Sequence, residues 1–226
     1  MNILLVYPQC PDSFWSFKNA LKFINKKAAV PPLGLITVSA MLPSSWHKRL
    51  VDMNVSALHA SDIQWADYVF ISAMYIQKQS VRKVMDECGK WHTKIVAGGP
   101  LFTQEHDNYP QVDHFILNEA EITLPPFLTD LEMGQPKRLY QTSEYADITQ
   151  TPVPDVHTCP NDKSSGAAGL VMAIVGGALM SPIQGAIIDL NQVTWLPALN
   201  FSFVLLLISF FVIAFFDYRC TEQSYN

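Results

Sequence analysis

The chain has 226 residues, of which 49% are apolar and 15% are charged, and its formal net charge at pH 7 is −5. This length fits one large domain, or one domain with an appended segment. A net negative charge without a basic stripe argues against a nucleic-acid partner, because no cluster of Lys or Arg would meet the phosphates.

The charges are unevenly distributed along the chain. Residues 1–163 hold 14 of the 15 Lys and Arg and 17 of the 20 Asp and Glu, whereas Asp189 is the only charged residue from Ala167 to Phe216. This split indicates two different environments. It predicts a soluble domain over 1–155, a linker or fusion junction over 156–166, a membrane hairpin over 167–219 and a tail over 220–226.

The cysteines indicate a reducing compartment. Cys10, Cys88, Cys159 and Cys220 are far apart and form no CxxC or CxxxCxxC set, so we expect free thiols rather than a disulfide framework or a metal site. The chain opens directly into "ILLVY", without the basic start of a signal peptide. We therefore expect the first domain to be cytoplasmic.

The first 155 residues alternate between strand and helix patterns. Strands are predicted at "NILLVYP", "HKRLVDMN", "ADYVFISAM", "TKIVAGGP" and "DHFILNEAE". Helices are predicted at "PPLGLITVSAMLP", at "QKQSVRKVMDECGKW" ending at Gly89, and at "TLPPFLTDLEMG" with Pro in its first turn and Gly134 as its stop. This alternation predicts an α/β fold, a Rossmann-like or flavodoxin-like doubly wound sheet of five parallel strands covered on both faces.

Ligands of such sheets bind beyond the carboxyl ends of the strands. The predicted strand ends are small, polar and glycine-rich, as close backbone approach to a ligand requires. They are Tyr7-Pro8-Gln9, Asp52-Met53-Asn54, Ser72-Ala73-Met74, Gly98-Gly99-Pro100 and Asn118-Glu119-Ala120-Glu121.

Several common ligands are excluded by the segment after the first strand. "YPQCPDSFW" contains no glycine, so it matches neither a dinucleotide-binding G-x-G-x-x-G turn nor a phosphate cradle for FMN. A P-loop is absent, and position 72 is Ser where a phospho-receiver domain would need Asp.

The six histidines are scattered, and we expect them at the surface.

Four segments in order carry a resemblance to a known family. "PPLGLITVSAMLP", "ISAM" with a Gln shortly after, "AGGP" and "NEAEITLP" resemble the cobalamin (vitamin B12)-binding domain of B12-dependent radical SAM enzymes, over about residues 1–155. The resemblance implies that a corrinoid lies against the strand ends, with its nucleotide tail between sheet and helices. It implies binding roles for Ser72, for the glycine pair Gly98-Gly99, and for the acidic pair Glu119 and Glu121.

The chain departs from that family pattern in three places. Asn118 stands where a glycine is usual, and Gln9 and Cys10 stand where other B12 proteins carry D-x-H-x-x-G, so no protein imidazole would bind cobalt. No CxxxCxxC motif follows the domain, so no [4Fe–4S] or S-adenosylmethionine site is expected. The expected function is thus cobalamin binding without catalysis by this chain alone.

Structural roles explain the same residues and stay open at this point. A glycine pair ends many strands as a simple turn, and Ser72 is a small residue at a strand end. Glu119 and Glu121 suit the amino end of a helix, where acids interact favourably with the helix dipole.

The last sixty residues contain two uncharged stretches. Ala167–Ile188 and Leu196–Phe216 are 22 and 21 residues long, enough for helices that span a bilayer. The short loop between them predicts an antiparallel transmembrane hairpin, with a buried helix pair as the alternative. Lys163 and Arg219 flank it, which places both ends in the cytoplasm at the cell inner membrane.

The first of these stretches has small residues at every fourth position. Such a seam favours close packing against other transmembrane helices. Its members are Gly169, Ala173, Gly177, Ser181 and Gly185. The two stretches resemble the eleventh and twelfth helices of fucose-permease-like sugar:proton symporters of the major facilitator superfamily. Two helices cannot form a transport path, because transport in that family needs two helix bundles.

The two resemblances together predict a fusion protein. Its expected partners are a corrinoid, membrane lipid and other transmembrane helices. Two alternatives stay open: a remnant of a sugar:proton symporter whose soluble domain is incidental, and a soluble domain that binds no small molecule and serves protein interactions.

Overall fold

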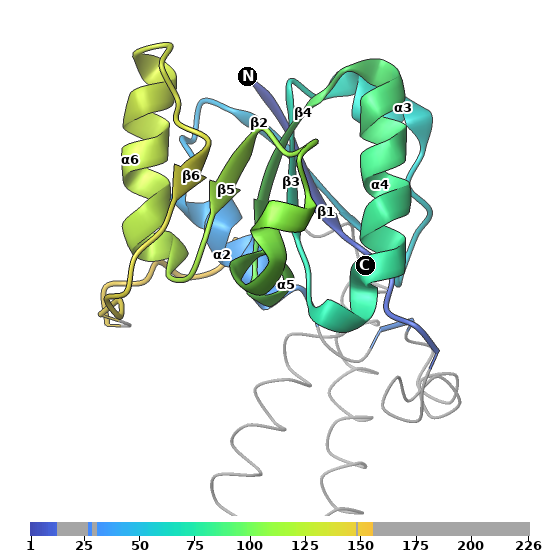
Figure 1. Cartoon of the computed structure of the whole chain (residues 1–226), viewed down its shortest axis with the longest axis horizontal. Helices are drawn as coiled ribbons and strands as arrows, with labels where there is room; N and C mark the ends of the chain where they lie inside the picture. Colours follow the sequence, from blue (N-terminus) through green and yellow to red (C-terminus); the bar gives the residue numbers. More distant parts are fainter. Residues whose placement is uncertain (13–26, 29–30, 148, 156–226) are drawn as a thin grey trace, which may run out of the picture.

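The computed structural model describes residues 1–12, 27–28, 31–147 and 149–155 (Figure 1). Within them, six strands form one parallel sheet in the order β2-β1-β3-β4-β5-β6. The strands are β1 (Asn2–Tyr7), β2 (His47–Asp52), β3 (Tyr68–Ser72), β4 (Lys94–Gly98), β5 (His114–Ile116) and β6 (Leu139–Tyr140). The helices are α2 (Leu33–Met41), α3 (Ala60–Trp65), α4 (Lys78–Trp91), α5 (Pro100–Glu105) and α6 (Ala120–Glu132), with single 3₁₀ turns η2 (Tyr75–Gln77) and η3 (His106–Asn108).

The predicted α/β class and the parallel, doubly wound sheet are confirmed. The order of the first five strands is that of flavodoxin-like sheets. β1 lies between β2 and β3, and its residues 3–6 are completely buried. This position explains the uninterrupted apolar run at the start of the chain, because a strand covered on both faces has no polar side.

The predicted number of five strands is wrong, because β6 adds a sixth. β6 has only two residues and follows Lys137 and Arg138, so no apolar run marks it in the sequence. It pairs with β5 and brings Tyr140 into the core at 6% exposure.

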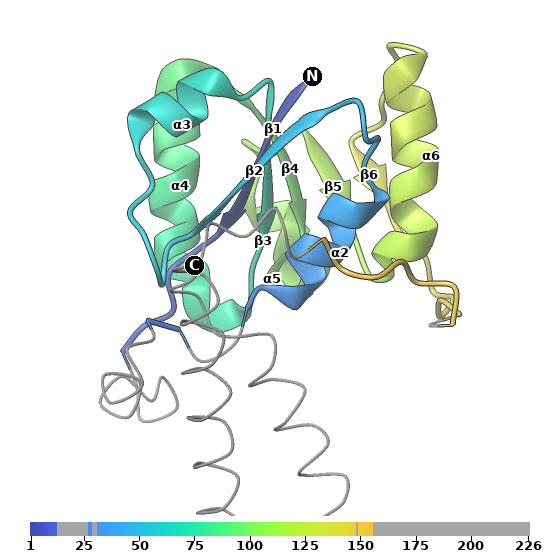
Figure 2. The same cartoon turned by 180° about the vertical axis from the view of Figure 1, so that it is seen from behind.

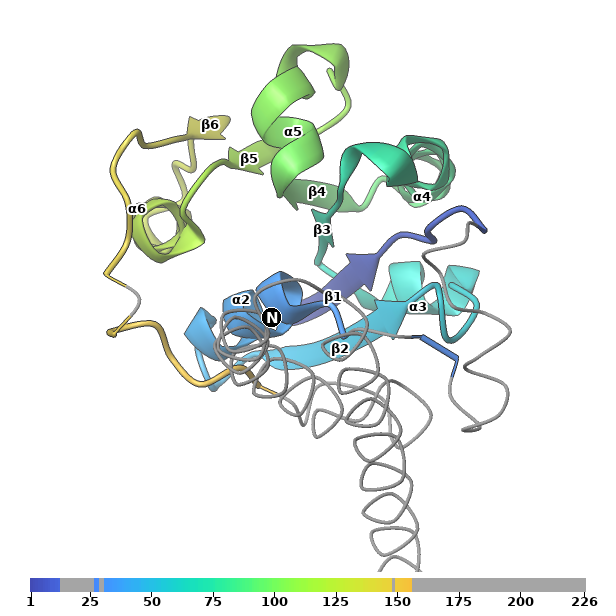
Figure 3. The same ribbon diagram turned by 90° about the horizontal axis from the view of Figure 1, so that it is seen from below.

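The sheet separates two helical layers (Figure 3). α3, α4 and α5 pack on one face, where Ile63, Val84 and Phe102 join the side chains of Leu4, Val6 and Ile71. α2 and α6 pack on the other face, where Leu35, Leu124 and Phe127 join Ile3, Leu5 and Phe70.

α6 reaches its face by an unusual connection. α5 links β4 to β5 on the face of α4, whereas α6 links β5 to β6 on the face of α2. Both connections lead to the next strand in the same direction along the sheet, but they cross on opposite faces. The two crossovers therefore have opposite hands, whereas connections between parallel strands are almost always right-handed. As a result α6 lies beside α2 rather than beside α5.

Helix ends differ from the sequence-based expectation in two places. α4 continues past Gly89 to Trp91 and ends where His92 adopts a left-handed conformation, with φ at 52°. α6 begins at Ala120, so its two prolines lie inside the helix rather than in its first turn. Gly134 stops α6 as predicted, with φ at 72°. The short helices α3 and α5 were not predicted, since six residues carry little periodicity.

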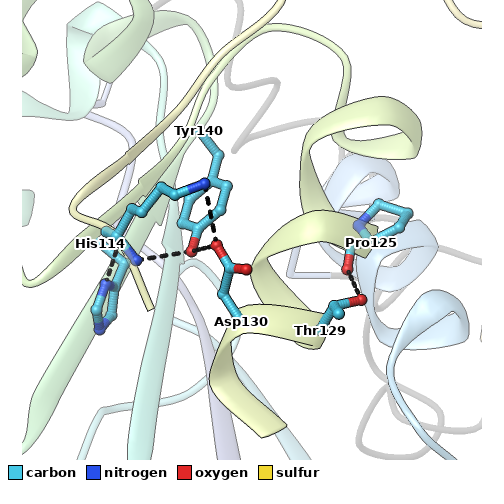
Figure 4. A network of polar contacts seen from close by, with 6 residues as sticks. His114, Pro125, Thr129, Asp130 and Tyr140 are labelled. Atoms are coloured by element: carbon cyan, nitrogen blue, oxygen red, sulfur yellow. Dashed lines mark hydrogen bonds and ion pairs between the residues drawn. The ribbon is translucent and has the colours of Figure 1, made fainter. Parts of the chain in front are cut away.

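A polar network joins β5, β6 and α6 (Figure 4). The Tyr140 hydroxyl donates to Asp130 Oδ2 at 2.9 Å and accepts from the backbone N–H of Lys137 at 2.7 Å. Nδ1 of His114 donates to the Lys137 carbonyl at 2.7 Å. His114 is 8% exposed, which corrects the expectation that all histidines lie at the surface. The network fixes the short strand β6 against α6.

The described helices include none that is long and apolar enough to cross a membrane. The predicted linker, transmembrane hairpin, small-residue seam and tail lie outside the described residues.

Candidate functional site: the carboxyl edge of the sheet

All predicted strand ends lie at one edge of the sheet, because every strand pair is parallel. The register places Tyr7 beside Asp52, and Ser72 beside Gly98. The turn after β3 hydrogen-bonds to the turn after β4, since the N–H of Leu101 donates to the Ala73 carbonyl at 3.0 Å. The segments that follow β3 and β4 are therefore joined at this edge.

A cavity of about 480 Å³ opens at this edge, between the sheet and helices α2 and α6. We call it the α2–α6 cavity. Its walls are mostly apolar, with Leu35, Val38, Phe70, Val96, Ile116 and Leu124 among them. Its polar side chains come from Thr37, Ser72, Asn118, Glu121 and Thr151. An apolar slot with a few polar groups is the usual form of a small-molecule site.

The glycine pair Gly98-Gly99, which lines the cavity at the end of β4, is required by the protein's own backbone. A Cβ atom on Gly98 would lie 2.7 Å from the carbonyl oxygen of Ile116 in β5. Gly99 has φ at 89°, and a Cβ there would lie 2.8 Å from Ser72 Oγ. The structural role of the glycine pair is therefore real, and it also leaves the cavity wall without side chains at this point.

The predicted acidic pair is divided between two places. Glu121 lines the α2–α6 cavity, and its Oε1 accepts a hydrogen bond from Thr151 Oγ1 at 3.2 Å. Glu119 is the residue before α6 and lines a separate groove with Pro100, Gln104 and Tyr145. Both acids lie at the amino end of α6, which fits the helix-dipole interpretation as well.

Asn118 precedes this pair with φ at 64°. A left-handed backbone is easy for glycine and is accepted by asparagine more readily than by most residues. Asn118 Nδ2 also donates to the Thr142 carbonyl. The substitution of asparagine for the glycine expected by resemblance therefore preserves the turn.

The loop after β1 is held by the polar side chains of Gln77 and Asn54 and lies apart from the cavity lining. Gln77 is completely buried, donates to the Pro8 carbonyl and accepts from the N–H of Met74 at 2.7 Å. Asn54 Oδ1 accepts from the N–H of Cys10 at 2.8 Å. These contacts join the loops after β1, β2 and β3. Predicted residues Tyr7, Pro8 and Gln9 thus share the edge with the cavity but do not line it.

Three acidic groups in and next to this loop have raised pKa values. Burial first, and then the charges of Cys10 and Asp52, raise the pKa of Tyr7 to about 12. Burial also raises the pKa values of the Cys10 thiol and the Asp52 carboxyl. Asp52 is 2% exposed, and its Oδ2 has no hydrogen-bond partner among the described residues. A polar residue at the end of an apolar strand was the sequence signal for Asp52, whereas nothing in the sequence indicated that Gln77 is buried.

Large apolar side chains are exposed around the edge. Met74, Tyr75 and Ile76 follow β3 with 41%, 56% and 57% exposure, and Leu33 at the start of α2 has 46%. Ala73, also predicted to contact ligand, is buried at 1% exposure. The edge thus offers an apolar rim beside the cavity.

The described residues hold no cluster of three or more His, Cys, Asp or Glu side chains that could bind a metal ion. The thiols of Cys10 and Cys88 are free. Burial raises the pKa of the Cys88 thiol to about 12, as expected for a structural cysteine.

The N-terminal part of the chain is similar to two curated enzymes. It is 41% identical over 157 residues to an uncharacterized methyltransferase of Synechocystis sp., an alignment that covers 68% of this chain and 29% of that protein. It is 32% identical over 157 residues to the hopanoid C-2 methylase of Rhodopseudomonas palustris, covering 67% of this chain and 30% of the methylase. The chain therefore spans less than a third of either relative.

A short C-terminal part is similar to a transporter. It is 64% identical over 58 residues to the L-fucose-proton symporter of Haemophilus influenzae, covering 26% of this chain and 14% of the symporter. No family model matches the chain, and no solved structure matches it. The two sets of relatives are consistent with a fusion of unrelated parts.

Proposed function

We propose that the described domain binds cobalamin, and that residues of the C-terminal part tether it to a membrane. The observation that carries the first proposal is the α2–α6 cavity, which lies at the carboxyl edge of a parallel sheet in a domain similar to methyltransferases. When bound, a corrinoid supplies a cobalt–carbon bond from which a methyl group can be transferred.

The shape and lining of the cavity fit the nucleotide tail of a corrinoid. The volume of about 480 Å³ accommodates a flat base with its ribose but not the corrin ring. Apolar walls such as Phe70, Val96 and Leu124 suit the faces of the base. Ser72 and Asn118 would donate hydrogen bonds to the phosphate, and Glu121 would accept one from a sugar hydroxyl.

The surface around the cavity mouth fits the corrin ring. Leu33, Met74, Tyr75 and Ile76 offer exposed apolar area to its flat face. The loop after β1 carries Cys10 instead of a histidine, and the raised pKa of its thiol disfavours the thiolate that would bind cobalt. We therefore expect the cofactor to bind with its own base displaced and without a protein imidazole.

A spectral titration tests cobalamin binding. Full-length protein in mild detergent is titrated with methylcobalamin and with hydroxocobalamin, and we expect a saturable shift of the methylcobalamin spectrum to the base-off form. Gly34→Leu should weaken binding at least about tenfold, because the new side chain enters the cavity from α2 where nothing lies within 4 Å.

Gly89→Leu is the matched control. Gly89 is also a helical glycine with nothing within 4 Å of an added Cβ, but it lies in α4 on the other face of the sheet. Its affinity should equal that of the parent. A folded parent protein with no spectral change at high cobalamin would overturn the proposed function and favour a protein-interaction role for the domain.

The membrane tether rests on the similarity of the C-terminal part to the L-fucose-proton symporter. Since the alignment covers 14% of the symporter, we propose anchoring rather than transport. The protein should stay in the membrane fraction after alkaline carbonate extraction. Release into the supernatant would refute the tether, and restored fucose uptake together with the missing helices would favour a transport remnant.

A further inference from the structure

Residues 151–155 form a strap between the two helices that wall the α2–α6 cavity. Figure 2 shows this segment, in orange, passing from the foot of α6 to α2. It begins after a turn in which the N–H of Thr149 donates to Asp147 Oδ1 at 3.0 Å. The strap lies outside every helix and strand, so its position depends on contacts at a few points.

The first attachment point of the strap is at α6. Thr151 lines the cavity, and its hydroxyl donates to Glu121 Oε1 at 3.2 Å. Glu121 lines the same cavity from the first turn of α6. This hydrogen bond between two residues that line the cavity joins the strap to α6.

The second attachment point is at α2, and we call it the latch. The N–H of Asp155 donates to the Ile36 carbonyl at 3.0 Å, and Asp155 Oδ2 accepts from Ser39 Oγ at 3.2 Å. Lys48 Nζ lies 3.5 Å from the same carboxylate oxygen and donates to the Ser39 carbonyl at 2.9 Å. Ser39 is completely buried, so the latch reaches through α2 to the edge strand β2.

The middle of the strap is suited to move as one piece. Pro152 and Pro154 have no N–H to donate and restrict the backbone to extended conformations. The side chain of Val153 between them is 87% exposed. The described hydrogen bonds of the strap are accordingly those of its two ends, Thr151 and Asp155.

We propose that the strap is the gate of the α2–α6 cavity, and that the Asp155 latch controls how fast a ligand enters and leaves. Loss of the contacts of the Asp155 carboxylate with Ser39 and Lys48 weakens the attachment at α2, while Thr151 keeps the other end near α6. The use of cobalamin as the probe rests on the proposed function, whereas the gate itself is a property of this chain's own residues.

Stopped-flow mixing of the full-length protein in detergent with methylcobalamin tests the gate. Asp155→Ala should raise both the association and the dissociation rate about tenfold and change Kd less than about threefold. A loosened gate lowers the same barrier for entry and for exit of the ligand, so the two rates rise together. Asp155→Asn keeps the acceptor for Ser39 but loses the charge that faces Lys48, so its rates should be intermediate. Val153→Ala changes the same strap at its exposed side chain and should match the parent.

Two results would overturn the gate. Rates of Asp155→Ala equal to those of Val153→Ala would show that the latch controls nothing. A faster dissociation with an unchanged association rate would show that Asp155 holds the ligand instead of gating it. Asp155→Asn, the milder change, supplies the same comparison where Asp155→Ala does not fold.

A second measurement needs no ligand and so separates the gate from the proposed function. Val96 is 2% exposed and lines the cavity, and Val96→Cys places a thiol there with little change in volume. Alkylation of this thiol, followed residue by residue with mass spectrometry, should be about tenfold faster when Asp155→Ala is added and unchanged when Val153→Ala is added. Equal rates would refute the gate, whether or not the parent binds cobalamin.

Discussion

The two faces of the sheet are filled in different ways. On the face of α4 and α5, the ring of Phe102 lies 5.1 Å from that of Tyr109 and 6.2 Å from that of Phe115, and all three rings are buried against the sheet. On the face of α2 and α6, the strand ends carry Ser72 and Gly98, and a cavity remains. The difference indicates that the α2–α6 face, besides its own buried core, keeps room for a ligand at the strand ends.

The largest effect should come from the filled face. Phe102→Ala removes a completely buried ring, and we expect the free energy of unfolding to fall by roughly 3–5 kcal/mol. Urea unfolding of the full-length protein in mild detergent measures the loss. Tyr145→Ala, at a side chain that is 92% exposed, should change it by less than about 0.5 kcal/mol. Similar values for the two variants would remove the contrast between the faces.

The next effect concerns the glycine at the border of the cavity. Gly98→Ala should lower the free energy of unfolding by roughly 1–3 kcal/mol, because the new Cβ would lie 2.7 Å from the Ile116 carbonyl oxygen. Gly89→Ala, in a helix with open space around it, is the control and should not destabilise the protein. An equally harmless Gly98→Ala would mean that β4 and β5 can separate there at little cost.

A smaller effect of opposite sign is expected inside the open face. Gly34→Ala adds a methyl group in α2 where nothing lies within 4 Å, so it should raise the free energy of unfolding by about 0.4–1 kcal/mol. Thermal unfolding monitored by circular dichroism would detect it. A loss of stability would show that the α2 side of the cavity is packed more tightly than described.

The smallest effect is a dependence on pH. Burial raises the pKa of Asp52, so the folded protein holds this proton more tightly than the unfolded chain. Its contribution to stability is present below the unfolded pKa and is lost as the pH rises through the folded pKa. Asp52→Asn cannot lose a proton, so its stability relative to the parent should increase from pH 3 towards pH 7. A pH-independent difference in urea unfolding between the two proteins would contradict this assignment.

The strand ends were predictable because a parallel sheet brings them to one edge whatever the details of packing. Ser72, Gly98, Gly99 and Glu121 were found from the sequence in this way, and all of them line the cavity. The separation of Glu119 from Glu121 was not predictable. It depends on where α6 begins, and the two prolines in the sequence pointed to a later start.

Long-range polar contacts were also outside the reach of sequence patterns. The bond from Ser39 to Asp155 joins residues 116 positions apart, and that from Gln77 to Pro8 joins residues 69 apart. A serine in an apolar helix and a glutamine after a strand carry no signal of their partners. The face of the sheet on which α6 packs was also not predictable from the sequence, because the handedness rule for parallel strands predicts the opposite face.

The crossover of α6 has a consequence for how the domain opens. The strands from β2 to β5 are connected without α6, β6 or the strap, and α3, α4 and α5 cover one face of this part of the sheet. We expect this C-terminal piece to detach as a cooperative unit before global unfolding, so amide hydrogens of α6 should exchange faster than those of β1 and β3. A ligand held between α2 and α6 would slow amide exchange in that unit most. A bound ligand would therefore also make the chain at Asp155 more ordered.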